Sequence, residues 1–323
     1  MWFNQLMFFS YTDEIAQSID ELEERLAEYR LKPCPPHAKS TLGFDSIITS
    51  DPDKLMHTVN GSHLLALTER QRLLPSGVIK AALEEKKQAY EIENQRPMSR
   101  SDAMQAKEML EFELLPKAFT IDKKRWFYID TQKKWVVVNA AQDGVASDII
   151  SYIIKSWGGH GFVPFDINMS LPTLMQFWLR APGTLTHGFQ LGAQCQLMRS
   201  EEDKTSYQCK DIEAHHGHLC ELLDQGFQIK SLELKWEDKL QFTLMDNFIF
   251  KKVKCLDILT DGLKENRSLE NQWAQMDADM ALLSGEIRSL MSDINGLIEG
   301  TENLEANALD AEAPKETIDP AIG

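Results

Sequence analysis

The chain is short of cysteine, of long apolar runs and of positive charge. Its five cysteines are odd in number and include no C-x-x-C pair, which favours reduced thiols over a disulfide framework. No uncharged stretch approaches the roughly 18 residues that a membrane span needs. The apolar start, residues 1–11, has no basic flank and no small-residue cleavage site, so it is a poor signal peptide. We therefore expect a cytoplasmic protein with no membrane segment.

The sequence also lacks common signatures of nucleotide-binding, hydrolytic and metal-dependent enzymes. It contains no G-x-x-x-x-G-K-S/T loop, no H-E-x-x-H pair and no G-x-S-x-G elbow. The glycine-rich residues 157–161 follow a predicted helix, so they offer no helix N-terminus to a phosphate. His215, His216, His218 and Cys220 cluster, yet a closed zinc site needs four convergent ligands and no second cluster supplies the rest. We predict no cofactor and no metal, although scattered acidic residues could still assemble a metal site in space.

The net charge of −16 is unevenly distributed along the chain. Residues 70–134 hold 14 Lys and Arg against 10 Asp and Glu, a balance of +4, whereas the rest of the chain holds 20 against 40. A protein this acidic repels polyanions from most of its surface. If it binds one, the binding face must be segregated, and this basic island is the first candidate.

Apolar periodicity predicts an α+β fold of antiparallel sheets with packed helices, in a protomer of several lobes. A strand at 1–9 precedes an amphipathic helix. Further strands are expected at 125–129 and 134–139, and helices at 143–157 and 171–180. Mixed strands and helices in this order favour sheets packed against helices.

Residues 76–96 and 99–115 are predicted to form a projecting helical hairpin, in which the first helix is polar on nearly every face and the second has a modest apolar face. Residues 227–253 alternate as three strands, and such an antiparallel meander can leave one face in water. Lys235 and Lys239 lie in this meander, which makes it the second place where a polyanion could bind.

We expect the chain to divide into four parts. They are a central α+β region (1–73 and 120–190), the hairpin (74–119), the meander with a long C-terminal helix (191–298) and a disordered acidic tail (299–323).

Six short segments occur in order between residue 1 and about residue 298. They are MWFNQLMFF at 1–9, LPSGVIK at 74–80, LLPKAF at 114–119, ID at 129–130, GFQL at 188–191, and LELKW at 232–236 followed by Gln241-Phe242. In this order and spacing the chain resembles the RdgC family of bacterial recombination-associated proteins. None of the segments is a catalytic signature.

The resemblance implies a ring-shaped, non-enzymatic homodimer with a positively charged hole. Such a protein would bind double-stranded DNA with little sequence preference, would also bind single-stranded DNA, and would restrain RecA-promoted strand exchange on the nucleoid. An acidic exterior and a basic lining can coexist, because sequence-independent affinity comes from Lys and Arg that neutralise phosphates.

Carried over residue by residue, the resemblance assigns roles to named side chains. Four bases in the helical segment would face DNA, and a fifth would lie on a projecting finger: Lys86, Lys87, Arg96, Arg100 and Lys210. Phe119 would lie at a dimer contact, with Leu115 and Pro116 beside it. The lysine-rich run typical of the helical segment is reduced here to residues 96–100, which gives the sheet lysines Lys235 and Lys239 more weight.

Other interpretations stay open. Lys86 and Lys87 follow Glu84 and could belong to a solvated, salt-bridged helix face, and Phe119 could be a core residue. The chain could also act by contacting RecA through its acidic C-terminal half, with DNA binding incidental. A hydrolase with a metal site built from scattered acids is the third possibility.

Overall fold

The computed structural model describes residues 2–12, 19–157, 161–167, 170–200, 203, 205–267 and 271–312. The strands are β1 Met7–Ser10, β2 Ser40–Asp45, β3 Met56–Val59, β4 Ser62–Arg72, β5 Thr120–Asp130, β6 Trp135–Val138, β7 Val163–Pro164, β8 Phe189–Met198, β9 Ser206–Cys209, β10 Gln228–Trp236, β11 Leu240–Met245 and β12 Phe250–Cys255. The α-helices are α1 Ile19–Glu28, α2 Ser76–Asn94, α3 Arg100–Leu114, α4 Asp143–Trp157, α5 Leu171–Arg180, α6 Ile212–Asp224, α7 Asp257–Arg267 and α8 Gln272–Glu312. In the part of the chain that these ranges cover, no helix is both long and apolar enough to cross a membrane.

Strands β1 to β7 form an antiparallel sheet in the order β2-β4-β5-β6-β1-β7, with β3 also paired to β4. Strand β6 reads Val136-Val137-Val138, and a run of β-branched residues is typical of a strand buried on both faces. Val136 and Val138 pack with helices α1 and α4, whereas Val137 packs with Phe8 on the opposite face. The sheet is therefore a buried layer at this point.

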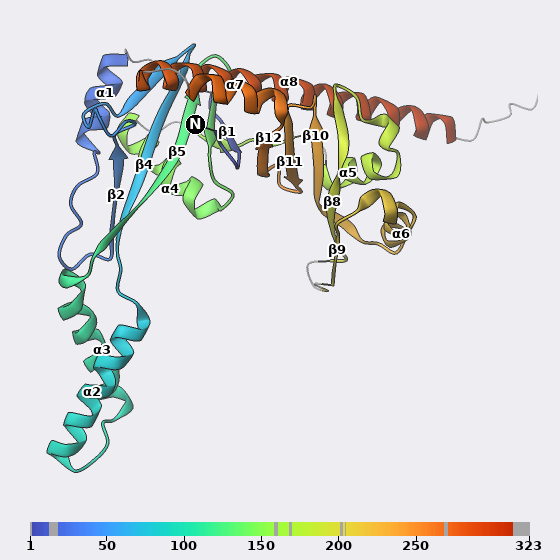
Figure 1. Cartoon of the computed structure of the whole chain (residues 1–323). Helices are drawn as coiled ribbons and strands as arrows, with labels where there is room; N and C mark the ends of the chain where they lie inside the picture. Colours follow the sequence, from blue (N-terminus) through green and yellow to red (C-terminus); the bar gives the residue numbers. More distant parts are fainter. Residues whose placement is uncertain are drawn as a thin grey trace, which may run out of the picture.

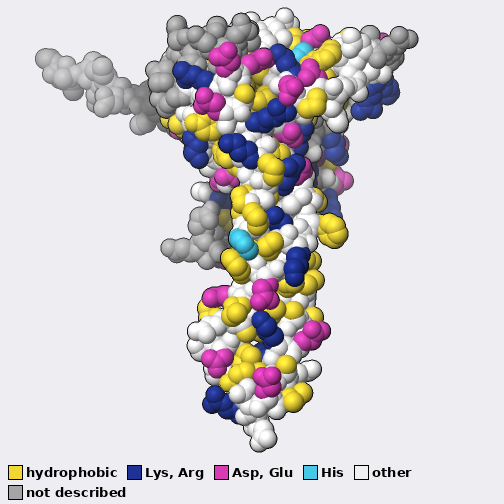
Figure 2. Space-filling view, turned by 90° about the vertical axis from the view of Figure 1, so that its left-hand side faces the viewer, with side chains coloured by type: hydrophobic (Ala, Val, Ile, Leu, Met, Phe, Trp, Pro, Cys, Tyr) yellow, Lys and Arg dark blue, Asp and Glu magenta, His cyan; other side chains and the backbone are white. Residues whose placement is uncertain are grey.

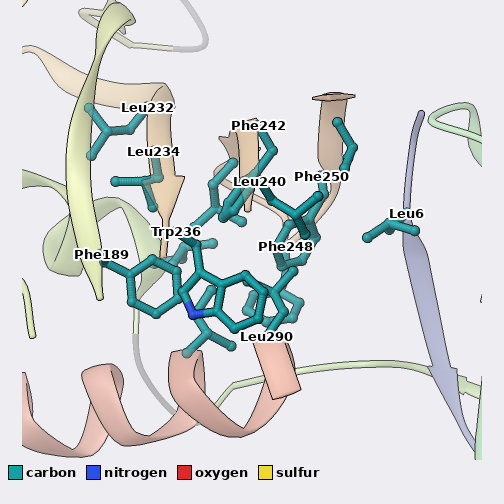
Figure 3. Close-up of a cluster of buried hydrophobic side chains, with 14 of the residues drawn as sticks. Leu6, Phe189, Leu232, Leu234, Trp236, Leu240, Phe242, Phe248, Phe250 and Leu290 are labelled. Atoms are coloured by element: carbon teal, nitrogen blue, oxygen red, sulfur yellow. The ribbon is translucent and has the colours of Figure 1, made fainter. Parts of the chain in front are cut away.

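The second antiparallel sheet has the order β12-β11-β10-β8-β9. Leu232, Leu234 and Trp236 alternate along β10 and are fully buried. Figure 3 shows them in a cluster with Phe189 of β8 and Leu290 of α8. Helices α5, α6 and α8 contribute to this cluster, so they cover one face of the sheet and leave the other uncovered.

Helix α8 runs across both sheets (Figure 1). Near the seven-stranded sheet, Arg288 Nε donates to Asp130 Oδ2 at 2.6 Å. Near the other end, the indole Nε1 of Trp178 in α5 donates to Thr301 Oγ1 at 2.9 Å. Because both contacts are made by one helix, α8 fixes how the two sheets sit relative to each other.

Helices α2 and α3 form a hairpin that projects from the far ends of β4 and β5, away from α8 (Figure 1). The guanidinium of Arg72, the last residue of β4, holds the hairpin base. Its Nη1 donates to the carbonyls of Leu115, Pro116 and Ala118 at 3.1, 3.2 and 3.3 Å, and its Nη2 donates to Cys34 O at 3.1 Å. Arginine suits this position because its planar fork carries five N–H donors.

The predicted α+β class with antiparallel sheets is confirmed, and so are the helices at 143–157 and 171–180. Several boundaries differ from the expectation. The first strand begins at Met7, α8 continues to Glu312 past the end expected at 298, and β3 and α7 were not predicted. Residues 158–160 of the predicted glycine turn lie outside the described residues, as do residues 313–323. The division into four parts stays a prediction.

Candidate nucleic-acid interface

The uncovered face of the five-stranded sheet, which we call the open face, is polar and basic. The strand registers place Gln190, Gln196, Gln208, Ser231, Glu233, Lys235, Gln241, Thr243, Lys251 and Lys254 on it. Lys210 follows β9, and Lys252 lies in a register irregularity of β12. The open face therefore carries five lysines and one carboxylate, Glu233. Its other polar side chains are amides and hydroxyls.

The open-face lysines carry charge that the fold does not neutralise. No ion pair among the described residues involves Lys210, Lys235, Lys251, Lys252 or Lys254. The one carboxylate of the face, Glu233, accepts from the backbone N–H groups of Ala193 and Gln194 at 3.0 and 2.9 Å. A net positive patch results in a chain of net charge −16, and such a patch attracts polyanions.

Lys239, which we predicted as a DNA contact, is placed differently from Lys235. Its Nζ lies 2.9 Å from a Glu237 oxygen, 3.3 Å from Glu286 of α8 and 5.0 Å from the Trp236 ring centroid. The hydrogen bond to Glu237 raises the pKa of Lys239 above its usual value. The Lys239 ammonium is therefore held on the side of the sheet that α8 covers. The geometry favours Lys235 over Lys239 as a ligand for phosphate.

The basic island resolves into two parts with different charge. Residues 76–117, the hairpin, hold 7 bases and 8 acids, a balance of −1. The remainder of the island, residues 70–75 and 118–134, holds 7 bases against 2 acids. Part of this excess is neutralised by acids outside these two segments, because Arg125 pairs with Glu69 at 2.8 Å and Lys124 with Asp45 at 3.2 Å, while Arg70 pairs with Asp122 inside them at 2.7 Å.

The hairpin bases that we predicted as DNA contacts are spread over α2, its connection and α3. Lys87 Nζ lies 2.7 Å from Glu84 Oε1, as the salt-bridged alternative expected, while no ion pair of the described chain involves Lys86. Arg96 donates to the Tyr90 hydroxyl at 3.2 Å, and Arg100 is exposed at the start of α3. These four bases therefore lie at different points of the hairpin: within α2, in the connection and at the first residue of α3.

Apolar side chains are exposed along the hairpin, as Figure 2 shows. Most of the large exposed apolar residues of the described chain lie on the hairpin or beside it: Leu73, Val78, Ile92, Met104, Met109, Phe112, Phe119 and Ile121. Phe119 is 85% exposed, so the alternative that it is a core residue of the single chain is wrong. Of the two residues predicted beside it at the dimer contact, Pro116 is exposed, whereas Leu115 is buried, with 7% of its surface exposed. Exposed apolar side chains gathered on one projecting element make the hairpin a candidate interaction site.

The histidine cluster forms no ligand set. His216 Nε2 lies 2.7 Å from Leu179 O, and His218 Nδ1 lies 3.4 Å from Glu221 Oε2. Within the described ranges, no group of three or more His, Cys, Asp or Glu residues is placed to hold a metal ion.

Sequence comparison decides the family. A family model described as “Putative exonuclease, RdgC” matches residues 1–301. The chain belongs to the RdgC family. Recombination-associated RdgC proteins of Yersinia pestis and Yersinia pseudotuberculosis are each 29% identical to it over 294 residues, covering 91% of this chain and 96% of the relative. The corresponding protein of Salmonella paratyphi B is 29% identical over 300 residues, covering 93% of this chain and 97% of the relative.

The glutamines of the open face were missed by sequence reasoning. Gln196 and Gln208 carry no charge and match no motif, so only the alternation of β8 and β9 could have placed them beside the lysines. Within this RdgC-family chain, the open face and the apolar hairpin surface are the two candidate interaction sites.

Proposed function

We propose that this RdgC-family chain is a non-enzymatic DNA-binding protein that acts in recombination and binds DNA through the open face of its five-stranded sheet. The observation that supports this most directly is the set of five unpaired lysines on one face of an acidic chain. Lysine ammoniums neutralise phosphates whatever the base sequence, so we expect duplex binding with little sequence preference and binding of single strands as well.

We further propose that two copies form a ring and that the hairpin supplies a contact between them. Phe119, 85% exposed, and Ile92, 81% exposed, are the most exposed large apolar side chains of the hairpin. Burial of such side chains against a second copy stabilises association by about 25 cal/mol per Å² of apolar area. Two-fold symmetry would then set two open faces around one DNA duplex.

DNA binding is tested by replacing Lys210, Lys235, Lys251, Lys252 and Lys254 with Gln in the full chain. Its control replaces five exposed bases elsewhere with Gln: Lys32, Lys155, Arg180, Lys264 and Arg267. Each lost phosphate contact lowers the slope of log affinity against log salt by about 0.9 on duplex DNA, so the open-face variant should lose up to about 4.5. The control should keep most of the wild-type slope. Equal slopes in all three proteins would contradict the proposal.

The hairpin contact is tested by sedimentation of Ile92→Ser/Phe119→Ser. The control is Ile258→Ser on α7, where Ile258 is 58% exposed and distant from the hairpin in the sequence. We expect the double variant to shift toward monomer and the control to sediment like the wild type. A double variant that sediments like the wild type would remove the hairpin contact.

The effect on recombination is proposed to be steric: DNA covered by this protein is denied to RecA filaments. The open-face variant should then restrain RecA-promoted strand exchange less, in proportion to its lost DNA affinity. Restraint that survives the loss of DNA affinity would instead favour direct contact with RecA. Incubation of labelled DNA with Mg²⁺ or Mn²⁺ tests the exonuclease description of the family model, and metal-dependent shortening of the strands would overturn the non-enzymatic proposal.

A further inference from the structure

The open face is hollowed at one point by a cavity of about 330 Å³. Three lysines, three glutamines and two hydroxyl residues line it, together with Cys195, Cys209 and Met245: Lys210, Lys251, Lys252, Gln194, Gln196, Gln208, Ser231 and Thr243. Every one of these eight polar side chains can donate a hydrogen bond, and none is a carboxylate. In a chain with 50 Asp and Glu, a lining without any acid selects for anions.

Two of the three register irregularities of this sheet, one in β12 and one in β8, border the hollow and turn side chains toward it. In β12 the register with β11 shifts between Gln241 and Thr243, and Lys252 at the shift has φ of +53°. Non-glycine residues rarely adopt this left-handed conformation, and bulges redirect side chains and are frequent near functional sites. The strain at Lys252 places consecutive lysines, 251 and 252, at the rim of the same hollow.

The second irregularity is in β8, where the register with β10 shifts between Leu232 and Leu234. The Glu233 carboxylate holds this bulge, because it accepts from the N–H groups of Ala193 and Gln194 and from the side-chain amide of Gln241. A Cβ on Gly192 would lie 2.5 Å from Glu233 Cγ, so glycine lets the carboxylate approach the bulge. Glu233 thus positions Gln194 at the hollow while its own charge is taken up by three donors.

We propose that this hollow is a phosphate-binding site. Three ammonium groups supply charge, and the amides and hydroxyls supply neutral donors for the remaining phosphate oxygens. Lysine binds phosphate as a point charge on a flexible side chain, which suits a site along which a nucleic-acid strand can slide. If the DNA-binding function proposed above holds, the phosphate is a backbone phosphodiester; the same chemistry would bind a free phosphate compound.

The test uses the full chain and inorganic pyrophosphate as the probe, at constant ionic strength. Pyrophosphate should raise the thermal unfolding midpoint of the wild type, since a ligand that binds the folded state stabilises it. The variant Lys210→Gln/Lys251→Gln/Lys252→Gln should lose this shift. A control with the same charge change, Lys155→Gln/Arg180→Gln/Lys264→Gln, lies outside the open face and should keep it. Equal shifts in all three proteins, or no shift in the wild type, would overturn the proposal.

A second arm separates the two sources of phosphate. A short oligothymidine strand should bind the hollow variant at least tenfold more weakly than the wild type, with a salt slope lower by about 2, because single strands lose about 0.7 per contact. If the wild type binds pyrophosphate but no DNA, the hollow remains a site for a free phosphate compound. That result would refute the proposed DNA-binding function instead. DNA binding that the hollow variant retains in full, with its slope, would refute the assignment of the hollow to backbone phosphate.

Discussion

The ion pair between Asp130 and Arg288 should be the most sensitive contact between α8 and the seven-stranded sheet. Asp130 is fully buried, and Arg288 Nε reaches its Oδ2 at 2.6 Å while Nη2 donates to Ser62 Oγ at 3.0 Å. Asp130 Oδ1 accepts from the backbone N–H groups of Gln132 and Lys133, each at 3.0 Å. The substitution Arg288→Met keeps most of the side-chain length and removes every donor.

The size of the effect follows from what remains around the carboxylate. Removing one partner of a buried ion pair costs about 3 to 5 kcal/mol, because the other charge stays buried without compensation. Here two N–H donors remain on Oδ1, so we expect the lower end, about 3 kcal/mol. The double variant Asp130→Asn/Arg288→Met carries neither charge. We therefore expect its free energy of unfolding to fall by only about 1 kcal/mol relative to the wild type.

Urea unfolding at pH 7, followed by tryptophan fluorescence and by circular dichroism, measures these losses. With a denaturant slope of about 3 kcal/mol per molar, Arg288→Met should lower the midpoint by about 1 M. The control is Arg180→Met, whose exposed pair with Asp224 should contribute less than about 1 kcal/mol. If Arg288→Met loses no more than this control, or if the double variant is as unstable as the single, the buried charge is not what Arg288 compensates.

Three further predictions concern the hairpin base and two buried titratable groups. Arg72→Met removes the donors that hold the hairpin base, so hydrogen exchange should accelerate through α2 and α3 with a loss of about 2 kcal/mol; unchanged exchange would contradict this. Burial lowers the pKa of His63 below 6.5, so the unfolded state binds the proton first and stability should fall as pH drops from 6.5 toward 5. His63→Asn should flatten that decline in the urea midpoint, and parallel curves would refute it. Burial raises the pKa of Tyr11 to about 12. The contribution of Tyr11 to the free energy of unfolding is therefore present below pH 10 and lost as pH rises through 12. The variant Tyr11→Phe should lose less stability than the wild type over that range.

The five-stranded sheet shows how much of this fold the sequence could predict. The alternation of Leu232, Leu234 and Trp236 with polar residues predicts one buried and one uncovered face, and the structure confirms that arrangement. Such period-two patterns are local, since neighbouring residues of a strand point to opposite faces. The position of α8 over Trp236 is a tertiary contact between segments far apart in the chain, which no local pattern encodes.

The candidate site shows where sequence reasoning stops. Lys235 and Lys239 are four residues apart and look equivalent in the sequence, but only Lys239 meets Glu286 of α8. The bulge that turns Lys252 depends on its pairing with β11, and the position of Gln194 depends on the carboxylate of Glu233. Ion pairing and register shifts arise from contacts between strands and helices, so charge counts along the chain cannot separate bound lysines from free ones.

The basic island shows that an excess of bases in the sequence does not identify the charge that the fold leaves unpaired. Its excess charge lies outside the hairpin, on segments where Arg70 and Arg125 are already paired with acids, while the five unpaired lysines of the open face lie on a sheet that is more than 70 residues further along the chain. Unpaired like charges on neighbouring strands repel one another and destabilise the free protein. A polyanion on the open face would remove that repulsion, whereas one on β4 and β5 would first have to displace the existing acidic partners. On this argument, DNA should bind where the fold leaves charge uncompensated, and the hairpin should serve mainly to bring a second copy of that face to the other side of the duplex.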